Sequence, residues 1–327
     1  MASRGSKMTV ALVVVCVLLG GGYVVYAALG PSQTTTDASP RAGKTAAEAA
    51  VMVRAVDPAS PSLNGGVFVV DEGKVQRRSK DLACERVYYA AGHGICMGIA
   101  SSGVDYTASV FDDKLQPEHS IRLTGLPSRA RVSADGRYGA MTVFVSGDAY
   151  LESSVAFSTR TYLLDMRSGK TIEQLEQFEV EKDGETIDAA DFNFWGITFD
   201  PVESDRFYAT LGTGTHHYLV EGSVRGKSMR VLRDGVECPS LSPDGKRIAF
   251  KSRLDGTDRW RLHVLDVATL ADHAVAEKRS IDDQAEWLDD DTLVYSDETN
   301  VYTVPADGSG EPVLLVKDAT SPVALRN

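Results

Sequence analysis

Short apolar runs separated by turn residues fill the chain beyond residue 48, and one such run recurs. Residues 241–250 read Leu-Ser-Pro-Asp-Gly-Lys-Arg-Ile-Ala-Phe, and residues 132–141 read Val-Ser-Ala-Asp-Gly-Arg-Tyr-Gly-Ala-Met. In each run an Asp-Gly pair offers the positive φ that a tight turn needs, and residues that favour β-strands flank it. The pattern predicts a strand, a turn and a second strand.

Weaker copies of this hairpin occur in the same phase. The first strands of the five copies are anchored at Tyr88, Val132, Phe199, Leu241 and Trp287, which are 44, 67, 42 and 46 residues apart. A spacing of about 40–50 residues is typical of a four-stranded propeller blade. The copies therefore predict five blades, and the long gap before Phe199 predicts an insertion.

Two more strands follow each hairpin, as at residues 260–267 and 273–277. A four-stranded sheet of this kind buries its faces only against neighbouring sheets, so the array is expected to close into a ring. Residues 321–326 resemble an innermost strand, and residues 49–54, 67–71 and 74–78 resemble three outer strands. Together they predict a sixth blade made from both ends of the domain, which pairs edges that would otherwise stay open.

These motifs also carry a family resemblance. The run at residues 242–250, followed by Arg-Leu-His-Val-Leu-Asp at residues 261–266, resembles the repeat of the TolB-like β-propellers. The resemblance spans residues 49–327. It is clear in the fourth copy and weaker in the second, while the first and third copies lack the Asp-Gly pair. It implies an all-β fold, a six-bladed β-propeller with four-stranded antiparallel blades, that serves as an extracytoplasmic binding platform.

An uncharged apolar segment near the start of the chain predicts a transmembrane signal-anchor. Residues 8–29 contain no charged residue, and as a helix they would be about 33 Å long, enough for a bilayer core of about 30 Å. Arg4 and Lys7 precede the segment and the next cation is Arg41. The positive-inside rule then places residues 1–7 in the cytoplasm and the propeller outside. The alternative is a cleaved signal peptide and a secreted domain, because Ala27 and Ala28 supply small residues after the apolar run.

Composition and charge limit the kinds of partner that the chain is expected to bind. Residues 30–48 are rich in Ser, Thr, Ala and Pro, which predicts a flexible linker before the propeller. The chain has 34 Lys and Arg against 46 Asp and Glu, a net charge of −12, with no basic block. This argues against binding nucleic acid through its phosphates. The expected partners are the membrane, through the first helix, and a protein or peptide of the cell envelope.

The loops that enter the innermost strands hold the candidate binding residues, because in a propeller these loops converge at the mouth of the central channel. The candidates are Arg129, Arg131, Asp188, Asp191, Asn193, Trp195, Glu237, Asp282, Asp283 and Glu286. A ring of acids with one basic sector could hold a cation or a peptide that carries Lys or Arg. The alternative is that these residues pair with one another and that Trp195 and Trp287 pack between blades.

Catalytic motifs are absent from the sequence. There is no Gly-x-Ser-x-Gly elbow, His-Glu-x-x-His pair, phosphate-binding loop or dinucleotide fingerprint, so no catalytic residue, metal or cofactor is assigned. The six histidines are scattered, and residues 289–291 occupy a turn rather than a calcium loop. We therefore expect a non-enzymatic binding or scaffold propeller. The alternative is a metal-dependent propeller lactonase or hydrolase that holds a cation with Glu237, Asp283 and Asp191.

Two of the four cysteines fall near each other in the predicted first hairpin. Cys84 and Cys96 lie on its two arms, on the same face if the turn is close to residues 91–94. An oxidising compartment would favour a disulfide between them, although a register shift of one residue would separate the thiols. Cys238 is expected to be a lone buried thiol.

Overall fold

The computed structural model describes residues 41–42, 50–56, 64–100, 102–145, 158–254 and 256–326. All of them belong to one compact unit, residues 39–327. The expected cytoplasmic residues 1–7, the membrane segment 8–29 and most of the linker lie outside the described residues. Among those that are described, no helix is long and apolar enough to cross a bilayer.

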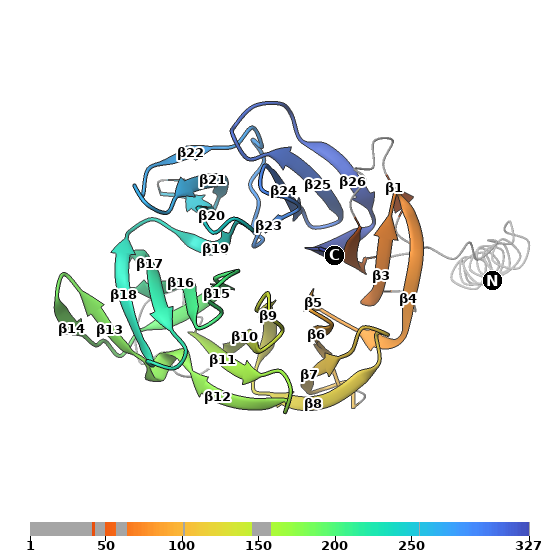
Figure 1. Ribbon diagram of the computed structural model, residues 1–327, viewed down its shortest axis with the longest axis horizontal. Helices are drawn as coiled ribbons and strands as arrows, with labels where there is room; N and C mark the ends of the chain where they lie inside the picture. The colour runs from red at the N-terminus through yellow and green to blue at the C-terminus, as the bar shows by residue number, and fades with distance from the viewer. Residues whose placement is uncertain are drawn as a thin grey trace, which may run out of the picture. The chain divides into compact units, whose positions relative to one another are not determined.

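Six sheets are arranged around a central axis as the blades of a propeller, each built on four antiparallel strands, which confirms the predicted fold (Figure 1). Blade one contains β5 (Arg86–Ala90), β6 (His93–Ile99), β7 (Tyr106–Phe111) and β8 (Pro117–Leu123). Blade two contains β9 (Leu126–Val132), β10 (Tyr138–Val145), β11 (Ser158–Asp165) and β12 (Lys170–Gln174). Blade four contains β19 (Glu237–Leu241), β20 (Arg247–Arg253), β21 (Trp260–Asp266) and β22 (Asp272–Ala274). In each blade the first strand is innermost.

Blade three carries the insertion that the 67-residue gap predicted. Its four expected strands are β15 (Asn193–Phe199), β16 (Arg206–Thr213), β17 (His216–Ser223) and β18 (Ser228–Arg233). After a 3₁₀ turn (Leu175–Gln177), an extra hairpin is formed by β13 (Glu179–Lys182) and β14 (Glu185–Ile187). Strand β13 pairs in parallel with β18, so that blade three has six strands.

The ring closes as the sequence predicted. Blade six places the carboxy-terminal β27 (Ala319–Ala324) innermost, followed by β2 (Val51–Ala55), β3 (Gly66–Asp71) and β4 (Lys74–Ala83). Strand β27 pairs antiparallel with β2, with Ala319 opposite Ala55 and Ala324 opposite Val51. The two ends of the domain therefore share one sheet.

Blade five has one strand that the sequence did not predict. It contains β23 (Glu286–Trp287), β24 (Thr292–Ser296), β25 (Asn300–Pro305) and β26 (Val313–Lys317). At its outer edge, β1 (Arg41–Ala42), from the range expected to be linker, pairs antiparallel with the end of β26. The backbone of this part of the linker thus adds to the sheet.

The repeated Ser-x-Asp-Gly sequence forms the same turn in blades two and four. Ser133 donates its hydroxyl to Asp135 at 2.6 Å and accepts the backbone N–H of Tyr138 at 2.9 Å. Ser242 makes the equivalent contacts with Asp244 and Arg247. The glycines that follow the aspartates have φ of 70° and 71°, the left-handed conformation that glycine adopts without strain.

A disulfide joins the closing blade to blade one, and confirms the predicted pair. Cys84 lies between β4 and β5 rather than on an arm of the first hairpin, where it was expected, and it is bonded to Cys96 on β6 with the two Cα atoms 5.2 Å apart. Both side chains are buried. Cys238 is a free buried thiol, as predicted.

Candidate functional site

The innermost strands line the channel, and three of them are interrupted by a residue in the left-handed conformation. These residues are Gly196 in β15, Cys238 in β19 and Ser321 in β27, with φ of 64°, 51° and 53°. Each lies where the pairing with the next strand loses its register. Such β-bulges leave peptide groups without ladder partners, so that other groups must satisfy them.

Gln284 satisfies several of these groups at once. It lies in the segment before β23 and is almost fully buried. Its side-chain Nε2 contacts the peptide oxygens of Gly196 at 3.0 Å and of Pro239 at 2.6 Å. One side chain of blade five thereby ties the bulges of blades three and four together across the channel.

A buried ion-pair network fills the next layer of the channel. Arg131 of β9 and Glu286 of β23 are 3.0 Å apart, and their side chains are 6% and 4% exposed. Glu286 also accepts the hydroxyl of Tyr88 at 3.0 Å and a guanidinium N–H of Arg326 at 2.9 Å. Burial, and then the charge of Glu286, raise the pKa of Tyr88, which keeps its phenol protonated as a donor. The channel is therefore closed by side chains below its mouth.

The end of the channel where the innermost strands begin opens into a cleft of about 990 Å³, here called the mouth cleft. Residues of blades one, two, four, five and six line it. Its wall on blades four and five holds the acidic side chains of Asp258, Asp282, Asp297 and Glu298 beside a cation, Arg279. Its wall on blades one and two is mainly apolar, with Tyr106, Leu126, Pro127 and Phe144, and Glu85 and Arg86 lie at its edge near the start of β5. Because those blade pairs lie on opposite sides of a six-bladed ring, an acidic wall faces an apolar one.

Asp282 is the acid of that wall that lies in the segment before β23, the innermost strand of blade five. Its carboxylate pairs with the buried Lys251 at 2.5 Å and with Arg129 at 3.8 Å, yet 62% of the side chain is exposed. Burial alone would raise the pKa of Asp282, but Lys251 and Arg129 hold it below its ordinary value. The carboxylate is therefore charged and reachable from the cleft at neutral pH.

Beside the cleft, Glu237 anchors a cluster of aromatic and cationic side chains between blades three and four. It accepts the indole N–H of Trp260 at 3.0 Å and pairs with Arg253 at 3.1 Å. Trp195 packs edge-on against His217, with ring centroids 5.6 Å apart. Both candidates thus hold structural contacts.

The remaining candidates on blade three stand apart from the mouth cleft. Asp191 accepts the hydroxyl of Thr213 at 2.8 Å and the backbone N–H of Gly214 at 2.7 Å, and the latter bond is the largest of the effects that lower the pKa of Asp191. Asn193 accepts the backbone N–H of Thr159 at 2.7 Å. Asp188 is exposed.

The structure thus divides the ten candidates into three groups. Asp282 and Asp283 line the mouth cleft, and Arg129 lines a small cavity beneath it. Arg131 lines the same cavity and pairs with Glu286. The five residues from Asp188 to Glu237 lie on blades three and four, outside the residues that line the cleft. The carboxylates of Glu237, Asp283 and Asp191 are not brought to one point, and within the described ranges no three His, Cys, Asp or Glu side chains are placed to hold a metal ion.

Sequence reasoning missed the cations that accompany these acids. Lys251 is the cross-strand partner of Glu237, and Arg86 lies two residues before Tyr88, on the same face of β5. The apolar wall was missed as well, although Leu126 and Phe144 are opposite each other on β9 and β10. Alternation along each innermost strand and its neighbour was the signal that could have found the two cations.

No protein-family model matches the chain, and no curated protein matches it in sequence. Solved structures share its fold. TolB from Acinetobacter baumannii superposes with a TM-score of 0.60 at 16% identity, over 84% of this chain and 66% of that chain. A propeller from a nidogen–laminin complex gives 0.55 at 11% identity, over 84% of this chain and 98% of that one. The chain therefore has the TolB-like six-bladed propeller fold, and it spans about two thirds of the length of the Acinetobacter protein.

Proposed function

We propose that this chain is a non-enzymatic binding propeller, and that its mouth cleft binds a protein or peptide that carries both basic and apolar side chains. The observation that carries the proposal is the make-up of the cleft, in which an acidic wall faces an apolar wall. A partner with Lys or Arg beside aromatic or aliphatic residues would match both walls.

On the acidic wall, negative charge predominates at the surface, because the cation that lines it, Arg279, is 41% exposed and is paired with Glu277 and Asp297. Asp258 and Asp282 have side chains that are 94% and 62% exposed, and Glu298 is exposed too. Lys251, the nearest cation to Asp282, has a side chain that is only 4% exposed. A Lys or Arg of a partner would therefore meet carboxylates first.

The apolar wall offers surface that a partner can cover. Leu126 is 51% exposed and Phe144 is 38% exposed, and they form a cross-strand pair. Pro127 and Tyr106 extend the same wall. Covering such side chains contributes about 25 cal/mol per Å² of apolar surface removed from water, which supports an apolar anchor in the partner.

The proposed place of action is the outer side of a membrane. The uncharged residues 8–29 support an anchor, with a cleaved signal peptide as the alternative, and the buried disulfide supports an oxidising compartment. Recognition of a protein is supported by the propeller of the same fold that was solved in a complex of nidogen with laminin.

Photo-crosslinking in intact cells tests the proposal. A photoreactive amino acid replaces Leu126 or Glu298 in the mouth cleft, and Val202 serves as the control, because it is 91% exposed in the turn between β15 and β16 at the opposite end of the channel. We expect the same adduct from both cleft positions and none from the control. An adduct from Val202 alone, or equal labelling at all three, would contradict the proposal.

A further inference from the structure

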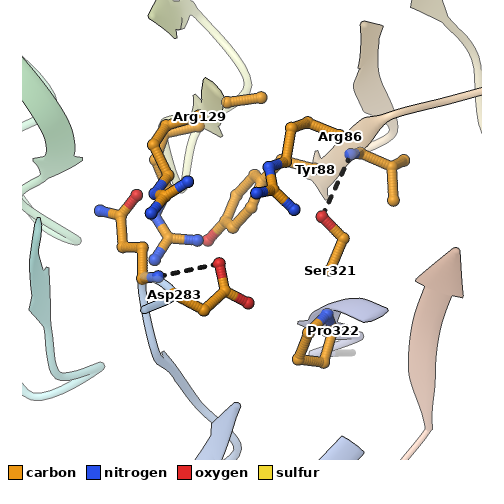
Figure 2. A pocket seen from close by; sticks show the side chains of 10 residues that line it. Arg86, Tyr88, Arg129, Asp283, Ser321 and Pro322 are labelled. Atoms are coloured by element: carbon orange, nitrogen blue, oxygen red, sulfur yellow. Dashed lines mark hydrogen bonds between the residues drawn. The ribbon is translucent and has the colours of Figure 1, made fainter. Parts of the chain in front are cut away.

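Beneath the mouth cleft lies a small cavity in which three arginines converge. Its volume is about 20 Å³, and Figure 2 shows Arg86, Arg129 and Tyr88 on one side of it and Asp283, Ser321 and Pro322 on the other. Arg131 also lines it. A cavity needs about 10–15 Å³ to hold one water molecule. This cavity therefore has room for one water molecule or one small ion.

The arginines are not equally neutralised. Arg131 pairs with Glu286, and Arg129 approaches Asp282 at 3.8 Å. Arg86 donates its Nε to the peptide oxygen of Ser128 at 2.7 Å, and among the described residues the carboxylate of Asp283 acts on it through its charge without forming an ion pair. Burial, and next the charge of Arg129, lower the pKa of Arg86, as expected for a cation that faces a second cation.

The carboxylates near the cavity are already engaged. Asp283 accepts the backbone N–H of Gln284 at 2.9 Å with one oxygen and the hydroxyl of Ser296 at 2.5 Å with the other. Glu286 is shared by Arg131, Arg326 and Tyr88. Within the part of the chain that the structure describes, the wall of the cavity itself carries three guanidinium groups and one carboxylate, that of Asp283, so that cations outnumber acids on it, although the chain as a whole has a net charge of −12.

We propose that this cavity is a binding site for one small monovalent anion, held by Arg86 and Arg129. The ligand is either a free halide or the carboxylate of a molecule that reaches down from the mouth cleft, since Arg86 and Asp283 line both spaces. Either one would relieve the repulsion between the two guanidinium groups. The site does not depend on the proposed peptide binding, so that each can fail without the other.

Thermal unfolding of the purified full chain tests the site. Sodium gluconate, whose anion is too large for the cavity, is replaced by sodium chloride, bromide or formate at constant ionic strength. We expect chloride and bromide to raise Tm by about 3 °C at ten times Kd. An equal rise with formate assigns the site to carboxylates as well, while no rise with formate restricts it to halides. An unchanged Tm in all four salts overturns the proposal.

Two variants and a diffraction measurement separate binding from general salt effects. Arg86→Gln removes the proposed ligand and should abolish the anion-dependent rise. Arg122→Gln removes the same charge from an exposed side chain paired with Asp105 and should retain the rise. Bromide-soaked crystals should show one anomalous peak within about 4 Å of the Arg86 guanidinium. Water density there with no anomalous peak, or an equal rise in the Arg86 variant, overturns the proposal.

Discussion

Arg131 and Glu286 come from opposite sides of the ring and form an ion pair of 3.0 Å in the centre of the channel, where both side chains are almost fully buried. The guanidinium also lies over the ring of Tyr88, 4.5 Å from its centroid. Since the pair links blades two and five across the axis, it closes the channel below the mouth cleft.

Replacement of the acid should destabilise the fold. Glu286→Gln leaves Arg131 and Arg326 without their carboxylate in a buried site, and we expect the free energy of unfolding to fall by about 3 kcal/mol. Urea denaturation measures it. The double variant Arg131→Met with Glu286→Leu should lose clearly less than the sum of its single variants. Additive losses would show that the two side chains do not act as a pair.

Reduction of the disulfide should loosen the joint between blades six and one. The bond closes a loop of 12 residues, and its loss is expected to lower the free energy of unfolding by about 3 kcal/mol. Urea midpoints of the parent and of Cys84→Ala with Cys96→Ala measure this effect. The number of free thiols titrated in the unfolded full chain should rise by two on reduction. An unchanged number would show that the bond is not formed.

The close approach of blades three and four gives a prediction for Gly196. A Cβ there would lie 2.6 Å from the Cα of Cys238, and φ is +64°. We expect Gly196→Ala to cost about 3 kcal/mol, because steric overlap adds to backbone strain. Gly184→Ala is the matched control, since φ is +85° and no atom lies within 4 Å, so that it should cost about 1 kcal/mol. Equal costs would rule out the steric contribution.

Glu176 should make stability depend on pH. Burial raises the pKa of its carboxyl from the ordinary 4.5 to about 7, and both oxygens accept the N–H of Thr161. The folded chain then binds more protons than the unfolded chain between pH 4.5 and 7, so that this residue lowers stability as pH rises through that window. Glu176→Gln should be more stable than the parent by roughly 2 kcal/mol at pH 8 and similar to it near pH 4.5. Urea midpoints at the two pH values measure this, and a constant difference would contradict it.

The fold could be predicted far better than the site. The Asp-Gly turns and their spacing are local signals, and Ser133 and Ser242 make the same contacts because the same residues recur around them. Partners across the channel are not local. Arg131 meets Glu286 only because a ring brings blades two and five face to face, and sequence alone could say only that both lie near the axis.

The residues of the mouth cleft could likewise be predicted only in part. Asp282 was found because it precedes an innermost strand. Leu126 and Phe144 were not, since an apolar pair on β9 and β10 looks like core until the structure shows both side chains exposed. An exposed apolar pair is a property of the assembled blades rather than of the alternation along one strand.

The most direct measurement of the proposed function is the affinity of the full chain for a fluorescein-labelled peptide of alternating Lys and Phe, followed by fluorescence anisotropy. Asp258→Asn with Glu298→Gln removes two exposed charges from the acidic wall, and Asp183→Asn with Glu185→Gln removes two exposed charges from the β13–β14 hairpin as the matched control. The account predicts that the first pair raises Kd about fivefold or more and that the control leaves it unchanged. Equal Kd values for the parent and both variants would contradict it.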